Sequence, residues 1–374
     1  MTPHTEAKHR ILRAYFGSWF SIIGQRFPRA LFVDGFCGPG EYSAGEQGSP
    51  VVVIEEARKA LAYPRLRLRH DFKLELYLID VDGKRIANLT GVLNGLGSLD
   101  GRLIAHLPIV GEFEEQIVPV LQDAEGSRQR TGWLVPLLVF IDPFGPKGFS
   151  METVGRILAL DGAEIFMLFD VDGLDRLLMR WDGSDQEQLT TTYGLTAERF
   201  EPIRQLNNQR QRIVELRKLY LESLRAKKLA SGFLPFRIYG TDGTPMHDLI
   251  FLTNNELGFV KMKDAMWKAD ASGEFRFGDA DQGQLTLPLE GTHEERLWKK
   301  LMGEFAGKTV SGAVVQRFVN LRTIYLKTHK TCTLRLHESD RVPADQRIGV
   351  TRRSSRGPKG YPDDAEITFP AQQA

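Results

Sequence analysis

The chain has 374 residues, more than one hydrophobic core usually organises, so its length predicts one large domain and a smaller one. Its composition, 42% hydrophobic and 26% charged, is that of a soluble globular protein. The 49 Lys and Arg residues balance 48 Asp and Glu to a net charge of +1, which gives no global case for a polyanionic partner. Any nucleic-acid surface must therefore be local.

Cysteine content and hydropathy exclude several classes of protein. Cys37 and Cys332 lie far apart, without metal-ligand neighbours at a useful spacing, so we expect free thiols and no metal site. No apolar run approaches membrane-spanning length, and the N-terminus lacks the apolar stretch of a signal peptide. We expect a cytoplasmic protein with no membrane partner.

Residues 6–23 place apolar side chains at helical spacing and predict an amphipathic helix before the first strand. The start of this helix is basic and includes Lys8 and His9. Charged residues are mostly solvated, so we interpret this end as exposed surface in preference to a phosphate contact.

Residues 31–53 predict a strand, a glycine loop and a helix. The apolar run ends at Asp34, and the chain then turns through Gly38 and Gly40. Glycines let a backbone turn sharply and approach a ligand, and the carboxyl ends of strands are where open α/β sheets bind ligands. Ser49, followed by proline, is the expected N-cap of the next helix. This stretch predicts a site for a nucleotide-like cofactor.

The next apolar strand ends at Asp80 and Asp82. An acidic residue after the second strand of such a domain can accept hydrogen bonds from both ribose hydroxyls. A nicotinamide site requires G-x-G-x-x-G with an acid about 20 residues further on. Here the turn has Gly38, Gly40 and Ser43, and the acids come roughly twice as far along. The nicotinamide alternative is therefore weak.

A third strand is followed by Glu112 and Phe113 and then by a helix. Glu112 is a candidate acceptor for an adenine amino group, with Phe113 packed on the ring. The alternative is that Glu112 only adds negative charge at a helix N-terminus, where it is favourable.

Residues 137–141 predict a buried central strand that stops at Asp142, Pro143, Phe144 and Gly145. This end offers a carboxylate, a fixed backbone carbonyl and an aromatic face, the groups needed to hold a flat base with an exocyclic amine. The same letters can mark a simple turn. Because Asp34 and Asp80 also end strands, we favour a site.

The chain continues with a strand, a polar helical insertion at about residues 182–230, an antiparallel strand pair and a short helix. In that helix Met262, Met266 and Trp267 are expected in the core. Residues 271–291, rich in Gly, Asp and Gln, predict a linker that ends a domain spanning residues 1–270.

Residues 292–374 predict three short helices, with Ser311 as the N-cap of the second, and two strands around a basic loop. This pattern suggests a winged helix that binds nucleic acid, with a protein-contact module as the equal alternative. The candidate nucleic-acid-binding residues are Lys327, Lys330 and Arg335, with His329 among them, on the third helix, and Arg352, Arg353, Arg356 and Lys359 in the wing.

The order VDGFCGPG, GSP, LIDVD, FIDPFG and MKDAMWKAD resembles the three-Cys-motif partner family, and SGAVVQRFV with TIYLKTHKTCTLRLHE is similar to its winged-helix tail. This resemblance covers most of the chain. It implies a methyltransferase-like α/β fold encoded beside a partner with a three-cysteine motif, a radical-type S-adenosylmethionine protein.

The broader resemblance is to class I S-adenosylmethionine-dependent methyltransferases. It implies an α/β Rossmann-like sheet whose cofactor loop contains Asp34, Gly38 and Gly40. By position, the resemblance implies that Asp80 or Asp82 binds the ribose and that Glu112 and Phe113 lie beside the adenine. Asp142, Pro143 and Phe144 resemble the amino-methyltransferase motif of Asp or Asn, two prolines and an aromatic, although one proline is missing and the aromatic comes a residue early.

The leading hypothesis is a methyltransferase, or a methyltransferase-like protein, that uses S-adenosylmethionine on an amino group of a nucleic-acid base. In it, Asp142 and the Pro143 carbonyl orient the amine while Phe144 stacks on a flipped base. The alternative is a catalytically silent scaffold that recruits the three-Cys-motif partner or a nucleic acid through its winged helix.

Overall fold

The computed structural model describes residues 3–42, 45–239, 245–270, 276–278, 291–352 and 360–371. The chain divides into two compact units, one of residues 1–269 with 275–283 and one of residues 270–274 with 284–374. Of the predicted linker at 271–291, residues 271–275 and 279–290 lie outside the described residues. Residues 276–278 form a strand of the first unit.

The first unit is built on a mostly parallel sheet in the order β3-β2-β1-β5-β6-β8-β7-β9, with β4 also paired to β2. Strand β8 runs antiparallel to both β6 and β7. The central strand β5 is buried throughout, as expected for a parallel strand covered on both faces. The strands are β1 (Arg29–Asp34), β2 (Lys73–Asp80), β3 (Leu103–Ala105), β4 (Ile109–Val110), β5 (Leu137–Ile141), β6 (Ala163–Phe169), β7 (Gly232–Tyr239), β8 (Pro245–Thr253) and β9 (Arg276–Gly278).

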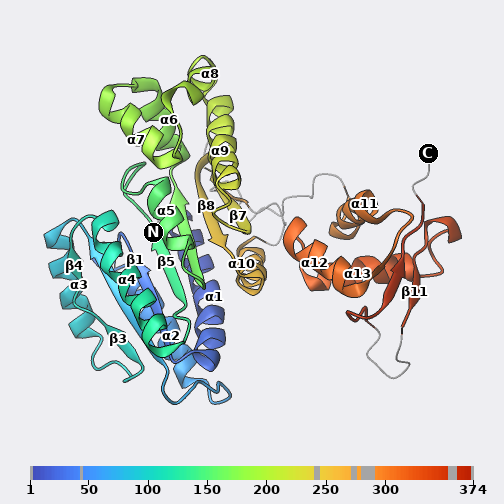
Figure 1. Cartoon of the computed structure of the whole chain (residues 1–374), viewed down its shortest axis with the longest axis horizontal. Helices are drawn as coiled ribbons and strands as arrows, with labels where there is room; N and C mark the ends of the chain where they lie inside the picture. Colours follow the sequence, from blue (N-terminus) through green and yellow to red (C-terminus); the bar gives the residue numbers. More distant parts are fainter. Residues whose placement is uncertain are drawn as a thin grey trace. The chain divides into compact units, whose positions relative to one another are not determined.

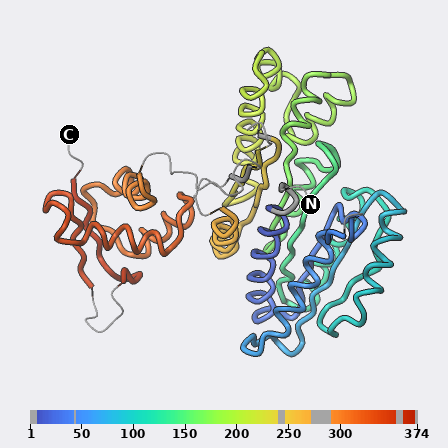
Figure 2. The backbone as a smooth tube through the Cα atoms, turned by 180° about the vertical axis from the view of Figure 1, so that it is seen from behind, coloured from blue at the N-terminus to red at the C-terminus, as the bar shows by residue number. Residues whose placement is uncertain are grey.

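Helices cover both faces of this sheet. Helix α1 packs against α2 and α10 on one face, and α4 and α5 lie across the other (Figures 1 and 2). The helices are α1 (Pro3–Arg26), α2 (Ser49–Ala62), α3 (Gly83–Gly95), α4 (Phe113–Thr131), α5 (Met151–Leu158), α6 (Val171–Arg180), α7 (Gly183–Tyr193), α8 (Glu201–Arg204), α9 (Gln209–Ala226) and α10 (Glu256–Ala269).

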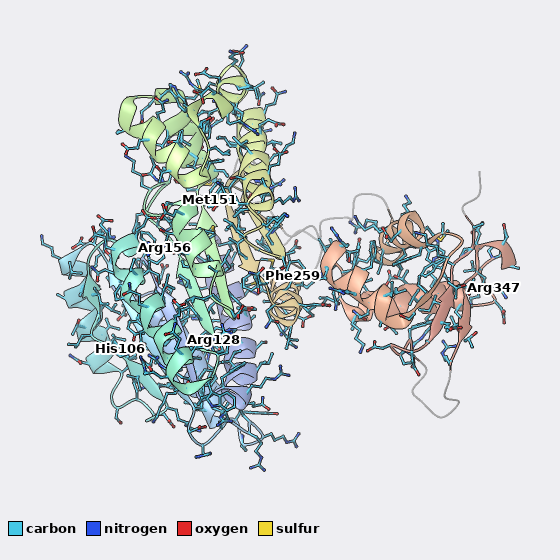
Figure 3. All side chains as sticks on the ribbon, viewed as in Figure 1. His106, Arg128, Met151, Arg156, Phe259 and Arg347 are labelled. Atoms are coloured by element: carbon cyan, nitrogen blue, oxygen red, sulfur yellow. The ribbon has the colours of Figure 1, made fainter. Side chains whose placement is uncertain are left out.

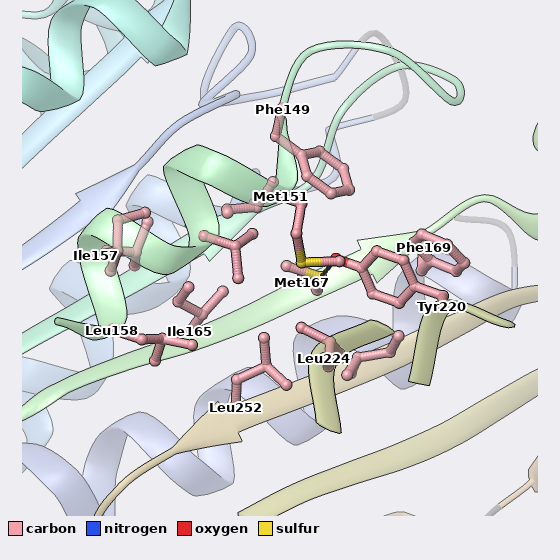
Figure 4. Close-up of a cluster of buried hydrophobic side chains, with 14 of the residues drawn as sticks. Phe149, Met151, Ile157, Leu158, Ile165, Met167, Phe169, Tyr220, Leu224 and Leu252 are labelled. Atoms are coloured by element: carbon pink, nitrogen blue, oxygen red, sulfur yellow. Dashed lines mark hydrogen bonds between the residues drawn. The ribbon is translucent and has the colours of Figure 1, made fainter. Parts of the chain in front are cut away.

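One core cluster lies between the sheet and the helices of the α4–α5 face. Met167 and Phe169 of β6 point towards α9, where Phe169 stacks on Tyr220 with ring centroids 4.1 Å apart (Figure 4). Met151 begins α5 beside α7, and Arg156 lies on the exposed side of α5 (Figure 3). On the opposite face, the ring of Phe16 in α1 packs against the ring of Phe32 in β1, with ring centroids 5.6 Å apart.

Two expectations about this unit are confirmed and one is wrong. The strands β7 and β8 pair antiparallel, and the predicted core residues of α10 are 0%, 0% and 8% exposed. The predicted N-cap Ser49 is instead inside α2, whose N-cap is Gly48 without a side-chain bond. The Ser49 hydroxyl is used elsewhere, because it donates to Asp34 of β1 at 2.6 Å.

The second unit has the element order helix, strand, helix, helix, strand, strand, and its sheet order is β10-β12-β11, all antiparallel. Ser311 is the N-cap of α12, as predicted, and accepts from the Val314 amide at 3.3 Å. The strand β10 was not predicted. The elements are α11 (His293–Phe305), β10 (Thr309–Ser311), α12 (Gly312–Arg322), α13 (Lys327–Glu338), β11 (Gly349–Thr351) and β12 (Glu366–Thr368).

Within the described ranges, no helix combines the length and apolar character needed to cross a bilayer. Cys37 is buried and Cys332 is exposed, both as free thiols.

Candidate functional site

Three strand ends come together around the glycine loop. Asp34 is paired with Leu78 of β2 on one side and with Phe140 of β5 on the other. Asp80 and Asp142 are each two residues further along those flanking strands. The parallel register therefore brings the predicted acids to one edge of the sheet, on either side of the loop that follows β1.

The loop has a conformation that requires glycine. Gly38 and Gly40 have φ of +63° and +79°, in the left-handed region. A Cβ on Gly40 would lie 2.6 Å from Cδ1 of Leu89, so α3 packs directly on the backbone. The Gly48 amide donates to the Gly40 carbonyl at 2.6 Å and closes the loop before α2.

Asp34 is an enclosed group that ties the loop to α2. Its side chain is fully buried, and it accepts from the Ser49 hydroxyl at 2.6 Å and the Phe36 amide at 3.2 Å. Burial raises the pKa of Asp34 to about 7, against the lowering effect of these two hydrogen bonds. Its two oxygens are thus already used, one by a backbone amide and the other by the Ser49 hydroxyl.

The two acids after β2 have different roles. Asp80 is 3% exposed and accepts from the Gly38 amide at 3.0 Å and from the Asp82 amide at 2.9 Å. Asp82 is the N-cap of α3 and accepts from the Lys84 and Arg85 amides, which lowers its pKa. Between the two candidates for the ribose, Asp80 is therefore the one beside the loop.

A cleft of about 850 Å³ opens at this edge of the sheet. Its walls include Phe36 after β1, Asp80 and Val81 after β2, Glu112 before α4 and Phe144 after β5, with α7 opposite. Three residues predicted from separate motifs, Asp80, Glu112 and Phe144, therefore line one cavity. The volume lies in the range of small-molecule sites.

One residue that the sequence predicted for the cofactor site lies in the core instead, and one residue of the cleft wall was not predicted. Phe113, expected to pack on an adenine ring, is 1% exposed, and a Cβ on Gly35 would lie 2.5 Å from its ring, so it belongs to the core. Val81 is 52% exposed on the cleft wall. An apolar residue directly after the acid at a strand end was the signal that could have identified it.

The wall charges are mainly negative. Exposed carboxylates come from Glu112, Glu115 and Glu187. The cations on the described walls are Arg85, 3.7 Å from Asp80, and Lys147. Such a field attracts a cationic ligand and repels phosphate.

The end of β5 separates Asp142 from Phe144. Asp142 pairs with Lys8 of α1, on the α1 face of the sheet. Pro143 is buried, whereas Phe144 is 63% exposed and carries the Arg85 guanidinium over its ring at 4.1 Å. One ring face is thus covered by a cation in a cation–π contact.

The basic start of α1 is not the solvated surface expected from its charge. Lys8 is 8% and His9 3% exposed. Burial, with the Lys8 charge next, lowers the pKa of His9 to about 4, so its imidazole is neutral. Burial, followed by the charges of Asp142 and Asp34, raises the pKa of Tyr42 to about 12. Through the Lys8–Asp142 pair, the start of α1 lies beside the end of β5.

The candidate nucleic-acid residues of the second unit divide into four groups. Lys327 and Arg335 are exposed on α13. Lys330 is 1% exposed, so its ammonium cannot reach a phosphate, and this prediction is wrong. Arg352 makes a two-bond pair with Glu338 at 2.6 and 2.7 Å. The other three wing residues, Arg353, Arg356 and Lys359, lie outside the described residues.

The side chain of His329 stabilises the start of α13, because its Nδ1 accepts from the Leu326 amide at 3.1 Å. In the part of the chain that the structure describes, no three His, Cys, Asp or Glu side chains are grouped so as to hold a metal ion.

No protein-family model and no curated protein matches the chain. Among solved structures, the chain is similar to the methyltransferase subunit of a type I restriction-modification system from Streptococcus thermophilus, with 7% identity and a TM-score of 0.33. The similarity covers 66% of this chain and 44% of that subunit, so the chain spans less than half of the subunit's length.

Proposed function

We propose that the first unit is a class I methyltransferase-like domain that binds S-adenosylmethionine at the carboxyl edge of its sheet. The observation that carries this proposal is the position of Asp80, which holds the Gly38 amide and lines the same cleft as Glu112. The acid proposed for the ribose, the glycine loop and the acceptor proposed for the adenine are thus close together.

The strand order supports the same assignment. From β1 the chain adds β2 and then β3 on one side of β1, and it later adds β5 and β6 on the other side. The order in which strands are added to the sheet therefore reverses between β1 and β5. Ligands of open α/β sheets bind at this switch point. Strand β8 lies between β6 and β7 and runs antiparallel to both.

The residues present fit an adenosyl cofactor. Asp80 keeps lone pairs for ribose hydroxyls beyond the two amides it accepts, and Glu112 is exposed for an adenine amino group. Val81 supplies an apolar flank in place of Phe113. The acidic walls suit the positive charge that the cofactor's sulfonium brings, together with its reactive methyl group.

We propose an amino group of a nucleic-acid base as the methyl acceptor. Phe144 offers an exposed aromatic ring for stacking, and Asp142 is the acceptor that would orient the amine. The acidic cleft does not attract the phosphate backbone, so backbone affinity must come from elsewhere, such as Lys327 and Arg335 of α13.

A silent scaffold is the second candidate, and one contact favours it. Lys8 already occupies the carboxylate of Asp142, where a substrate amine would bind. In this case the second unit, which we propose to be a winged helix, recruits a three-Cys-motif partner or a nucleic acid. Lys327→Met then weakens nucleic-acid binding several-fold if nucleic acid is the partner, and leaves it unchanged if a protein is.

Isothermal titration calorimetry tests the cofactor assignment. The full chain is titrated with S-adenosylmethionine, S-adenosylhomocysteine and NAD, and we expect the two adenosyl ligands alone to bind. Glu112→Gln should weaken binding about tenfold through one lost charged hydrogen bond. Glu125→Gln, an exposed acid further along the same helix, is the matched control. Binding of NAD alone, or of no ligand, would overturn the proposal.

A further inference from the structure

An ion pair joins the start of α1 to the end of β5. The Lys8 Nζ donates to Asp142 Oδ2, and the two side chains are only 10% and 14% exposed. Desolvating two charges is costly, so a pair of this kind is weak support for stability by itself. Its position at the expected amine site makes a chemical role worth testing.

We propose that Lys8 is an internal methyl acceptor, whose amine occupies the amine position at Asp142 and is methylated within its own chain. This inference rests on the proposed function. It adds a modification site to that function and names the class of the acceptor as a primary alkyl amine.

The location of the pair supports this role. Asp142 lies two residues beyond Phe140, the β5 partner of Asp34, and therefore flanks the glycine loop. The charges of Asp142 and Lys8 both act on the pKa of Asp34, so the pair lies beside that loop. The amine is thus held next to the segment assigned to the cofactor.

The amine is also held in a fixed position. Lys8 extends from a helix that packs on α2 and α10, and its neighbour His9 is 3% exposed. Among the described residues, the Nδ1 of His9 has no hydrogen-bond partner, so an unpaired polar atom lies in the same enclosed region. A nucleophile fixed in this way reacts faster because it is already positioned, and no separate acceptor molecule has to bind.

The proposed transfer balances without another reactant. The Lys8 ammonium gives one proton to the Asp142 carboxylate, which frees the nitrogen lone pair. The nitrogen–carbon bond then forms as the methyl carbon–sulfur bond breaks, and that electron pair stays on sulfur. The products are a methylated ammonium, a neutral thioether and a protonated Asp142, which releases its proton to water.

Mass spectrometry of the full chain tests this transfer. After incubation with isotope-labelled S-adenosylmethionine, we expect one labelled methyl group on the peptide that contains Lys8. Lys59, which pairs with Glu56 on the surface at 2.7 Å, is the matched control and should stay unlabelled. Lys8→Arg should abolish the label, and Asp142→Asn should slow its incorporation by about a hundredfold or more. The rate per chain should not change on dilution.

A second measurement needs no cofactor. With a small acylating reagent, Lys8 of the unliganded chain should react at least about tenfold more slowly than Lys59, and Asp142→Asn should remove this protection. Equal labelling of both lysines, or protection that Asp142→Asn leaves intact, would overturn the inference. Calorimetric binding of S-adenosylmethionine without any label at Lys8 overturns the inference alone, whereas absence of binding overturns the proposed function as well.

Discussion

The carboxylate of Asp80 accepts a hydrogen bond from the backbone amide of Gly38 at 3.0 Å, and so connects the end of β2 to the loop that follows β1. The same carboxylate lines the cleft. A ligand that bonds to Asp80 therefore acts on a group that already determines the shape of the glycine loop. Ligand binding and loop stability are expected to change together when Asp80 is altered.

Asp80→Asn should destabilise the first unit and weaken cofactor binding. The two oxygens of Asp80 accept from two different amides, and an Asn side chain has only one acceptor oxygen. One enclosed amide is left without a partner, at a cost of about 1–3 kcal/mol. Urea unfolding measures the loss. Asp82→Asn is the control, because Asn caps a helix as well as Asp does, and an equal loss in both variants would contradict the assignment.

Gly40→Ala should be more destabilising than Gly45→Ala, although the two glycines have nearly the same φ, +79° and +77°. Both substitutions add about 1–2 kcal/mol of left-handed backbone strain. Only at Gly40 does the new Cβ meet a side chain closely, with Cδ1 of Leu89 at 2.6 Å, whereas the nearest atom at Gly45 is 3.9 Å away. We expect an additional loss of about 1–3 kcal/mol for Gly40→Ala in urea unfolding. Equal losses would show that α3 does not support the loop.

Much of this edge could be predicted from the sequence because parallel strands bring their carboxyl ends together. Each apolar run that stopped at an acid therefore marked the same place in space, which is how Asp80, Glu112 and Phe144 reached one cleft. The glycine loop could also be predicted, because the left-handed backbone at Gly38 and Gly40 depends on the local residue type.

The errors arose where packing between distant segments decides the outcome. The charge of Lys8 favoured exposure, and only its distant partner Asp142 makes burial possible. Phe113 follows a polar loop, but it fills the space left by Gly35. Lys330 belongs to a basic run, yet its place on α13 turns it inward. A single sequence carries no local signal for these long-range contacts.

Asp34→Asn should remove a pH dependence of stability. The folded pKa of Asp34 is about 7, above its ordinary value of 3.8, so the folded state binds this proton more tightly than the unfolded chain does. Its contribution to stability is full below pH 3.8 and is lost as the pH rises towards 7. Asn imitates the neutral carboxyl at every pH.

The free energy of unfolding of Asp34→Asn, minus that of the unaltered chain, should therefore increase from about pH 4 to pH 7. The slope is at most about 1.4 kcal/mol per pH unit, the value for one proton. Urea unfolding across this range measures the difference directly. A difference that stays constant with pH would show that Asp34 is ionised throughout and that its burial does not control its proton.

Lys330→Met should stabilise the second unit at neutral pH. Burial, with the Lys327 charge next, lowers the pKa of Lys330 from 10.5 to about 8, so the folded state binds its proton less tightly than the unfolded chain. This costs stability as the pH falls from 10.5 through 8, and the cost is full at pH 7. Native-state hydrogen exchange of α13 in the full chain should show a gain of about 1 kcal/mol that disappears at high pH. Lys327→Met, at an exposed position of the same helix, removes only the second of these two causes and should show a smaller gain. A loss of protection in Lys330→Met would mean that the buried ammonium stabilises the unit.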